Sequence, residues 1–309
     1  MTASGEGSPR VLIVGGAGQV GVELQRSFAG FGRVRWVDRE TFDMADPEQT
    51  RALVREDAPD VVLNAAAYTA VDRAEKEPEV ANAINAEAPR VLAEEARRLN
   101  ALLVHYSTDY VFDGGKNSPW VETDEPGPLG VYGESKLAGE RAIEQAGGRY
   151  LIFRTSWVYG PHGNNFLLTM LRLAGERERL SIVDDQVGGP TTSIELAGAT
   201  RAIVEGALAS KFGATQDWAG LYHMTCGGVV SWFGFAQAIF ARAAAQLNVR
   251  APELTPITTE QYPLPAKRPK YSVLSNQKLA DRFGLQLAGW EEALDEVFQR
   301  LLESRQASV

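Results

Sequence analysis

Short apolar runs alternate with helical patterns through the first half of the chain. Each run is long enough for a strand buried on both faces, as strands of a parallel sheet are. Strands are expected over residues 11–14, 34–37, 61–63, 102–106 and 150–153. Helices are expected over 19–28, from 47 behind an Asp46 cap, over 79–99 and from 132 to about 145. The alternation predicts an α/β fold with a doubly wound parallel sheet, whose strand ends share one ligand-binding edge.

The second half of the chain has a less regular pattern. Helical periodicity is expected over residues 166–174, 194–208, 231–247 and 290–302. Gly/Pro-rich segments at 184–192 and 255–272 are expected to be loops. There is no internal repeat and no clean linker. These later segments predict a smaller second domain that is interleaved with the first.

Composition narrows the class of protein. The 309 residues are 44% hydrophobic and 23% charged, which is ordinary for a soluble globular protein of one large domain or two intimate ones. A net charge of −9 argues against a general nucleic-acid binder, although a local pocket can still take a phosphorylated ligand. The single cysteine, Cys226, excludes an internal disulfide. No apolar run or leader suggests a membrane span or export, so a cytoplasmic protein is expected.

A glycine-rich turn joins the first expected strand to the first expected helix. Gly15, Gly18 and Gly21 have the spacing that lets a backbone approach a pyrophosphate at a helix N-terminus. Asp38, 20 residues after Gly18, ends the second strand, where a carboxylate can bind ribose hydroxyls. Arg39 can accept a 2′-phosphate, or it can be a solvated loop residue. The pattern predicts a dinucleotide, with NADPH and NADH both open.

Tyr132 and Lys136 lie four residues apart, which places them on one face of a helix. A nearby ammonium favours the phenolate and is expected to draw the tyrosine pKa towards neutral, where it can pass a proton. A shift of about three units takes roughly 4 kcal/mol, so a partly buried site is implied. Thr108 ends a buried strand 24 residues before Tyr132. Its hydroxyl can orient a substrate carbonyl beside the tyrosine, or it can cap a turn.

Together these residues resemble a known family. The glycine spacing, Thr108 and the Tyr132–Lys136 pair resemble the extended short-chain dehydrogenase/reductases. Several longer blocks are similar to the dTDP-4-dehydrorhamnose reductase family, and the likeness runs from residue 11 to about 302. The blocks are at residues 64–75, 106–112, 154–159, 185–191 and 265–272.

The resemblance implies a Rossmann-type fold and an NAD(P)H-dependent reduction. The substrate would be dTDP-6-deoxy-L-lyxo-4-hexulose and the product dTDP-L-rhamnose, a precursor of cell-surface polysaccharide. Hydride would go from the nicotinamide to the sugar C4, while Tyr132 protonates the alkoxide oxygen. Lys136 would tune Tyr132 and hold the nicotinamide ribose, and Thr108 would bind the reacting oxygen.

The resemblance also assigns contacts position by position. Lys267 and Arg268 could neutralise the substrate diphosphate, or be solvated, and Asn165 could contact the nucleotide or cap a helix. The resemblance implies substrate contacts for Thr108, Asp109 and Trp157, although the sequence around Trp157 would also suit a core tryptophan; Asn165 and Arg268 are expected as further substrate contacts. It implies cofactor contacts for Gly18, Gln19, Val20, Asp38, Asp43, Met44, Ala67, Tyr68, Thr69, Tyr106 and Lys136. The motifs described above add Gly15, Gly21, Arg39 and Tyr132 as cofactor contacts.

Domain limits, metal and assembly follow as further expectations. Residues 1–9 are expected to be a tail, 10–162 an NAD(P)-binding Rossmann domain to which 191–225 returns, and 163–309 mainly a substrate-binding domain. Some relatives are described as dimers with magnesium bound by interface glutamates. Glu23 occupies a plausible position, but residues 192–195 do not reproduce the second ligand. Magnesium is therefore possible but not predicted, and the chain is expected to be a monomer or homodimer.

Two other functions are compatible with parts of this pattern. A nucleotide-sugar epimerase or a 4-reductase acting on another sugar would share the fold and Thr108, Tyr132 and Lys136. A non-catalytic NAD(P)-binding regulatory subunit would keep the fold and the glycine loop without turnover. The presence of all three reactive side chains weighs against the regulatory subunit.

Overall fold

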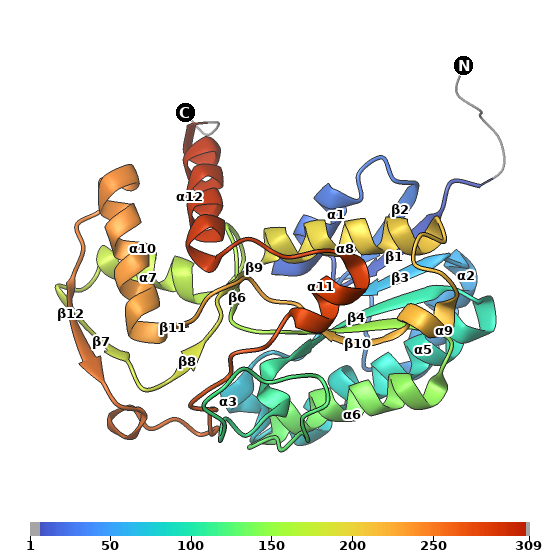
Figure 1. The fold of residues 1–309 in the computed structure, drawn as a ribbon, viewed down its shortest axis with the longest axis horizontal. Helices are drawn as coiled ribbons and strands as arrows, with labels where there is room; N and C mark the ends of the chain where they lie inside the picture. Colours follow the sequence, from blue (N-terminus) through green and yellow to red (C-terminus); the bar gives the residue numbers. More distant parts are fainter. Residues whose placement is uncertain (1–6, 307–309) are drawn as a thin grey trace.

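Six parallel strands form the central sheet of the computed structural model, which describes residues 7–306 (Figure 1). The strands are β1 (Arg10–Val14), β2 (Arg33–Val37), β3 (Val61–Asn64), β4 (Leu102–Thr108), β5 (Arg149–Thr155) and β10 (Gly220–His223). Their spatial order is β10-β5-β4-β3-β1-β2, and every neighbouring pair is parallel. The order reverses next to β1, so the loops after β1 and β3 meet at the switch point. The predicted α/β class with a doubly wound parallel sheet is confirmed.

Helices cover both faces of this sheet. On one face α1 (Gln19–Ser27) packs beside α8 (Ser193–Leu208), and on the other α5 (Ala88–Leu99) lies between α2 (Pro47–Asp57) and α6 (Val131–Ala146) (Figure 1). Alternate strand residues serve the two faces, because successive side chains point in opposite directions. The core of the first face contains Val11 and Ile13, and that of the second Leu12 and Val14.

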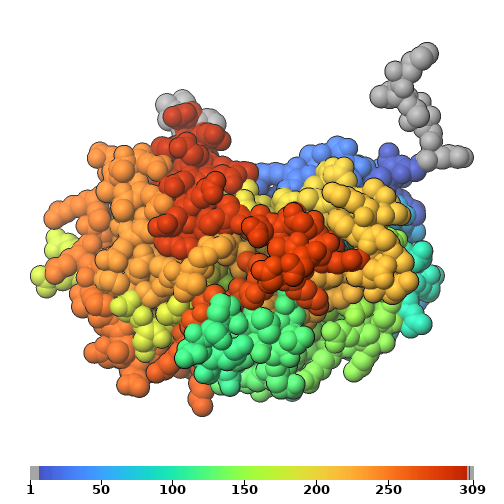
Figure 2. All heavy atoms as spheres, in the orientation of Figure 1, coloured from blue at the N-terminus to red at the C-terminus, as the bar shows by residue number. Residues whose placement is uncertain are grey.

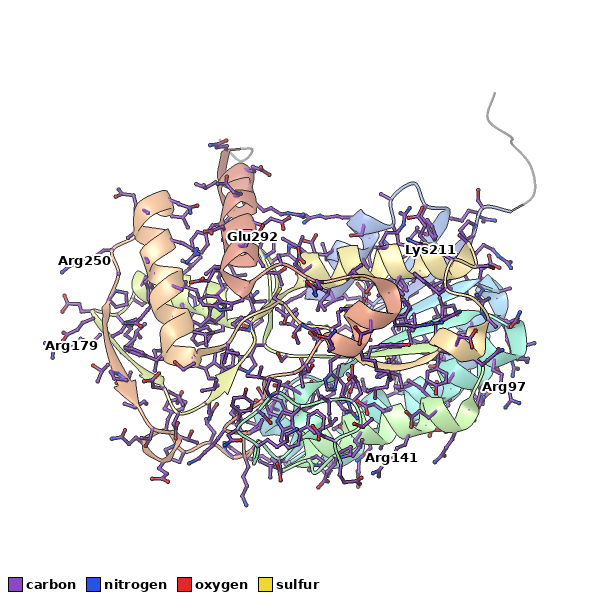
Figure 3. All side chains as sticks on the ribbon, in the orientation of Figure 1. Arg97, Arg141, Arg179, Lys211, Arg250 and Glu292 are labelled. Atoms are coloured by element: carbon purple, nitrogen blue, oxygen red, sulfur yellow. The ribbon has the colours of Figure 1, made fainter. Side chains whose placement is uncertain are left out.

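Local signals place several of these helices. Asp46 accepts hydrogen bonds from the backbone N–H groups of Glu48 and Gln49 at 2.9 and 3.3 Å, so the predicted cap is confirmed. The helix expected over 79–99 is α4 (Pro78–Asn82), a π-helical turn (Ala83–Glu87) and α5. Charged side chains point outward around the sheet, as Figure 3 shows for Arg97 and Arg141.

A second hydrophobic core lies beside the sheet. It is built by α7 (Phe166–Ala174), α10 (Trp232–Leu247) and α12 (Trp290–Gln306), with a parallel pair of strands, β7 (Arg179–Val183) and β12 (Glu253–Ile257). The prediction of a loop from residue 255 is wrong at its start, because β12 continues to Ile257. Pro256 hides this strand in the sequence, since proline is tolerated only at sheet edges, and β12 is such an edge.

Short elements complete the described chain. Residues 184–192, expected as a loop, contain two two-residue strands, β8 (Val187–Gly188) and β9 (Thr191–Thr192). The remaining elements are α3 (Val71–Ala74), a 3-10 turn (Asp109–Val111), β6 (Val158–Tyr159), β8 (Val187–Gly188), β9 (Thr191–Thr192), α9 (Thr215–Trp218), β11 (Val230–Ser231), a 3-10 turn (Thr259–Gln261) and α11 (Gln277–Phe283).

Later segments return to the sheet after the second core has begun. Both α8 and β10 belong to the sheet region, although α7 and β7 precede them in the chain. Figure 2 shows the orange and red segments covering one end of the molecule and reaching across its front. The division at residue 162 stays a prediction. Most of the predicted tail, residues 1–6, lies outside the described residues, and Gly7–Pro9 have no regular secondary structure. Within residues 7–306, no helix has the length and apolarity needed to span a membrane.

Candidate active site

The glycine turn leaves β1 and starts α1 with open backbone amides. Gly18 is the N-cap of α1, and no side chain caps the helix there. Gly15 has a positive φ of 86°, and a Cβ on it would lie 2.6 Å from the backbone nitrogen of Ala66 after β3. A Cβ on Gly21 would lie 2.1 Å from the carbonyl oxygen of Gly15. The turn is therefore closed to larger residues and suited to an anion at the helix N-terminus.

Replacing Gly21 with alanine is expected to weaken NADPH binding by roughly tenfold or more, because the new methyl group must push the turn open. Fluorescence titration with NADPH measures the dissociation constant. Gly198→Ala is the matched control, since no atom lies within 4 Å of the position that a methyl group would take on this exposed glycine of α8. Equal affinities for Gly21→Ala and Gly198→Ala would contradict the assigned role of the turn.

The predicted cofactor contacts lie at neighbouring strand ends. Asp38 follows β2 and accepts from the backbone N–H of Glu40 at 3.0 Å, whereas the exposed Arg39 makes no side-chain hydrogen bond or ion pair with the described residues. The carboxylate of Asp43 accepts from the backbone of Ala45, and Met44 is buried. Gln19 and Val20 open α1, and Ala67, Tyr68 and Thr69 follow β3.

Tyr68 is held in place by a residue that the sequence analysis missed. Asn85, fully buried in the π-helical turn, accepts from the Tyr68 backbone N–H at 2.8 Å and donates to its carbonyl at 3.1 Å. The same amide donates to the Ser135 hydroxyl of α6 at 3.0 Å. The Tyr68 hydroxyl donates to Glu77 at 2.6 Å, which raises the tyrosine pKa. Asn85 thus joins the loop after β3 to α6, the helix that carries Tyr132 and Lys136.

Thr108 and Tyr132 come together at the end of β4. Burial raises the pKa of Tyr132 and the neighbouring Thr108 side chain lowers it, while the Thr108 hydroxyl donates to Asp109 at 3.1 Å. The Tyr132 ring packs edge-on against Tyr110, with ring centres 5.4 Å apart. Burial raises the pKa of Asp109 to about 6 against hydrogen bonds that lower it. The structure therefore joins the threonine and tyrosine that the sequence singled out.

Lys136 is buried one helical turn beyond Tyr132. Its Nζ donates to the Tyr106 carbonyl at 2.6 Å and lies 3.1 Å from Nε2 of His105. Burial lowers the pKa of Lys136 to about 8, and burial also raises that of Tyr132 to about 12. The prediction that the lysine draws the tyrosine pKa towards neutral is therefore wrong in this structure. Desolvation disfavours both charged forms and is the largest influence on the pKa of each.

The start of α6 is fixed by a carboxylate from another helix. Glu75, the C-cap of α3, accepts from the backbone N–H of Val131 at 2.9 Å. A Cβ on Gly130 would lie 2.4 Å from that carboxylate, and one on Gly133 would lie 2.2 Å from the Tyr110 carbonyl. Glu75 thereby sets the first turn of the helix that carries Tyr132. Sequence analysis missed it because the partners lie 56 residues apart.

A cavity of about 940 Å³ opens beside this cluster, between α7, β7 and the segment 259–270. Leu129, Ala266 and Lys267 line both this cavity and the small depression at Tyr132. Its wall is apolar along Phe166 and Met170 and cationic at one side. Such a volume suits a nucleotide sugar. The cationic residues are Lys267, Arg268 and Lys270.

The predicted substrate contacts differ in how they face the cavity. Trp157 adopts a positive φ of 46° and stacks on Trp232, a cavity residue, with ring centres 3.5 Å apart. Arg268 lines the cavity and binds Asp72 through two nitrogens at 2.7 and 3.1 Å. Trp157 therefore supports the wall through Trp232, and Arg268 is held at the cavity by Asp72 of the sheet region.

Two residues that were predicted to contact ligands make hydrogen bonds within the protein instead. Asn165 caps α7 by accepting from Leu168 at 3.0 Å, and its amide donates to the Gln19 side chain at 2.9 Å. This favours the capping interpretation. Tyr106 contacts the Thr200 hydroxyl through its own hydroxyl at 2.6 Å, while its carbonyl receives Lys136.

Glu23 does not present a metal site. The buried carboxylate receives Arg26 at 2.8 Å and Arg300 at 3.0 Å, and His162 lies 3.3 Å away. Two guanidinium groups already neutralise its charge, so the carboxylate as placed does not fit a cation. Over residues 7–306, no group of three or more acidic, histidine or cysteine side chains is arranged for a metal.

Known proteins resemble this chain over nearly its full length. A dTDP-4-dehydrorhamnose reductase of Burkholderia thailandensis is 48% identical over 290 residues, which cover 92% of this chain and 96% of that protein. The enzyme of the same name from Escherichia coli K12 is 43% identical, covering 94% and 97%. A crystal structure of the Bacillus anthracis dTDP-4-dehydrorhamnose reductase in complex with NADP superposes with a TM-score of 0.86 at 37% identity, covering 95% and 100%.

More distant structures share the fold alone. A Thermus thermophilus UDP-glucose 4-epimerase in complex with NAD has a TM-score of 0.72 at 23% identity, and the alignment covers 94% of this chain and 98% of the epimerase chain.

The family described as the RmlD substrate binding domain matches residues 9–303 of this chain. The resemblance read from the sequence is confirmed, and the chain belongs to this family of dTDP-4-dehydrorhamnose reductases.

Proposed function

We propose that this protein reduces the 4-keto group of dTDP-6-deoxy-L-lyxo-4-hexulose with NAD(P)H and forms dTDP-L-rhamnose. The observation that carries the proposal is the neighbouring pair of Thr108 and Tyr132, with the buried Lys136 one turn further along α6. Tyr132 lines a depression that shares Leu129, Ala266 and Lys267 with the cavity. The relatives named dTDP-4-dehydrorhamnose reductase support it at 43–48% identity. The reaction belongs to dTDP-rhamnose biosynthesis.

The side chains divide the reaction between them. A bound nicotinamide supplies the hydride that reaches the sugar C4. Thr108 holds the carbonyl oxygen beside the Tyr132 hydroxyl, which gives up its proton as that oxygen becomes negative. The raised pKa of Tyr132 keeps the hydroxyl protonated until the alkoxide forms. Lys136 then stabilises the phenolate left behind, because a cation close by is most favourable when the tyrosine is charged.

The cofactor would lie along the ends of β1, β2 and β3. The uncapped start of α1 would take the pyrophosphate, and Asp38 the adenosine ribose. Arg39 makes no side-chain hydrogen bond or ion pair with the described residues and stands next to Asp38, so it is available to a 2′-phosphate. NADPH and NADH therefore both fit, with Arg39 giving NADPH the added contact. The NADP complex of the Bacillus anthracis relative supports this assignment.

Arg39→Ala is expected to raise the KM for NADPH by about tenfold or more and to leave the KM for NADH within twofold, because a charged hydrogen bond contributes about 1.5–3 kcal/mol. Initial rates with each cofactor measure the effect. Arg33→Ala is the control, because Arg33 is an exposed arginine at the start of β2, the strand that precedes Arg39. An equal rise of the KM for NADPH and for NADH would show that Arg39 does not bind the 2′-phosphate.

The substrate would occupy the cavity with its sugar at Tyr132. The apolar wall along α7 suits the nucleoside, and Lys267 and Arg268 would neutralise the diphosphate. Residues 163–309 would then act mainly as the substrate-binding domain, in a monomer or homodimer. No intrinsic metal is assigned to the reaction.

The substrate assay tests the proposed function. Purified protein, the 4-keto substrate and NADPH are combined, and NADPH consumption and dTDP-L-rhamnose formation are followed. If the folded protein binds NADPH yet consumes none, the proposal is wrong. Turnover only with a different nucleotide sugar would identify another 4-reductase or epimerase. Cofactor binding without turnover on any of these sugars would indicate a regulatory subunit.

A further inference from the structure

The short helix α3 carries a carboxylate for which the proposed reaction gives no role. Asp72 lies in the first turn of α3, just after the predicted cofactor contacts that follow β3. Its carboxylate accepts three hydrogen bonds from one stretch of the other half of the molecule. One oxygen accepts from the backbone N–H of Ala266 and from the Arg268 guanidinium, both at 3.1 Å. The other oxygen accepts from Arg268 at 2.7 Å. Asp72 therefore holds both the backbone and a side chain of this stretch.

The contact between Asp72 and Arg268 has the geometry of a strong ion pair. Two N–H groups of the guanidinium meet the two carboxylate oxygens, and such bidentate pairs are stronger and more directional than single contacts. The Arg268 side chain is 18% exposed and that of Asp72 35%, so the pair is partly shielded from water. The guanidinium lowers the pKa of Asp72, which keeps the carboxylate charged at neutral pH.

The stretch that Asp72 holds belongs to the segment 259–270, whose two ends are fixed within their own half of the molecule. At the first end, the backbone N–H and hydroxyl of Thr259 donate to Asp185 at 2.8 and 2.7 Å. At the other end, the Lys270 carbonyl accepts from a backbone N–H of β8 at 2.8 Å. Between these ends the chain is exposed, as at Tyr262. A segment fixed only at its ends could take several positions over the cavity, and the contacts with Asp72 select one.

This segment also forms part of the depression at the reactive tyrosine. Ala266 and Lys267 line the depression together with Tyr132, and both also line the large cavity. Glu75, at the end of α3, fixes the first turn of the helix that carries Tyr132. The two carboxylates of α3 therefore fix two sides of one site, since Glu75 places the tyrosine and Asp72 places the segment beside it.

We propose that Asp72 is a positioning residue that holds the segment 259–270 against the sheet region and so pre-organises the pocket for the nucleoside diphosphate of the substrate. Its contacts place Arg268 and the adjacent Lys267 at the cavity before the substrate arrives. Less of the chain then has to be ordered on binding, which raises the affinity. This inference rests on the proposed function, because it takes a dTDP-linked sugar as the occupant of the cavity.

The opposite role for Asp72 would be competition with the diphosphate for the Arg268 guanidinium. Competition would need only the ion pair, whereas the hydrogen bond from the Ala266 backbone fixes the position of the chain itself. The two roles predict changes of opposite sign. Removing the charge of Asp72 weakens diphosphate binding if the carboxylate positions the segment, and strengthens it if the carboxylate competes for Arg268.

Asp72→Asn tests the proposal, because the amide keeps the size of the side chain but has no charge and only one accepting oxygen. We expect the dissociation constant for dTDP, measured by titration calorimetry, to rise about fivefold or more, with NADPH binding within about twofold. The KM for the sugar should rise in parallel while kcat stays within about threefold of the wild type. Asp72→Ala, which removes all three hydrogen bonds, should show the larger effect.

Limited proteolysis reports on the segment without turnover. Trypsin cleaves after lysine, and the bond between Lys267 and Arg268 lies in the stretch that Asp72 holds. Cleavage at this bond, identified by mass spectrometry, should be about fivefold faster in Asp72→Asn than in the wild type, because the loosened segment reaches the protease more often. Added dTDP should slow this cleavage in the wild type.

Asp295→Asn is the matched control for Asp72→Asn. Asp295 on α12 also binds an arginine through two nitrogens, Arg242 of α10 at 2.6 and 3.2 Å, with similar partial exposure. This variant should keep the wild-type affinity for dTDP and the wild-type cleavage rate. Urea unfolding checks that each variant is folded.

The outcomes separate this inference from the proposed function. Unchanged dTDP affinity and cleavage in both Asp72 variants would overturn the inference and leave the proposed function standing, as would tighter dTDP binding by Asp72→Asn. A wild type that neither binds dTDP nor reduces the sugar would count against the proposed function. In that case the rate of cleavage after Lys267 still shows whether Asp72 holds the segment.

Discussion

Tyr132→Phe is expected to lower kcat by about 10²–10⁴, the usual contribution of a positioned proton donor, with NADPH binding within about twofold. The substitution removes the hydroxyl that meets Thr108 and keeps the ring that packs edge-on against Tyr110. The site should therefore keep its shape and lose its acid. Steady-state NADPH consumption gives kcat, and fluorescence titration gives the dissociation constant.

Tyr150→Phe is the matched control for this experiment. Tyr150 lies near the start of β5, at the opposite end of the strand from the active site, and its hydroxyl takes no part in the proposed chemistry. The control should turn over like the wild type. If Tyr132→Phe retained more than a tenth of the wild-type kcat, another group would have to be the acid.

Arg154→Met is expected to lower the free energy of unfolding by about 3–5 kcal/mol, because it strands a buried carboxylate. The Arg154 and Glu140 side chains are 4% and 2% exposed, and two hydrogen bonds at 2.6 and 2.9 Å join them. Glu140 also receives the Ser107 hydroxyl, next to Thr108. The pair thus fixes the end of β4 against α6 and β5. Urea unfolding measures the loss.

An exposed ion pair gives the comparison for Arg154→Met. Arg172→Met breaks the exposed pair between Arg172 of α7 and Glu176 just after it, whose side chains are 60% and 49% exposed, and should cost less than about 1 kcal/mol. The double variant Arg154→Met, Glu140→Met should be more stable than Arg154→Met alone, since it leaves no unpaired charge. A loss no larger than that of Arg172→Met would contradict the interpretation of a buried pair.

The parts of this structure that were predictable from the sequence are those set by neighbouring residues. The buried strands appear as unbroken apolar runs, and the glycine turn and the Tyr132–Lys136 spacing each depend on fewer than ten consecutive positions. The Asp46 cap was predictable for the same reason. These local signals were sufficient for the α/β class and for the edge of the sheet that carries the site.

Contacts between distant segments were not predictable in this way. Arg268 meets Asp72 across 196 residues, and His105 meets Asn64 across 41, so no spacing rule points to either pair. The pKa of Tyr132 was misjudged for a related reason. The sequence shows the neighbouring lysine, but the degree of burial depends on how α6 packs against the sheet.

The carboxylate of Glu75 at the head of α6 has a consequence for protein engineering. The Tyr132–Lys136 segment looks like a portable module, since the spacing is contained in one helical turn. Its orientation, however, comes from Glu75 at one end and from Asn85 through Ser135 in the middle. Transplanting the helix into another scaffold without these two supports would transfer Tyr132 and Lys136 without the contacts that orient them. The smallest transferable unit of this chemistry begins at residue 75 and includes the π-helical turn.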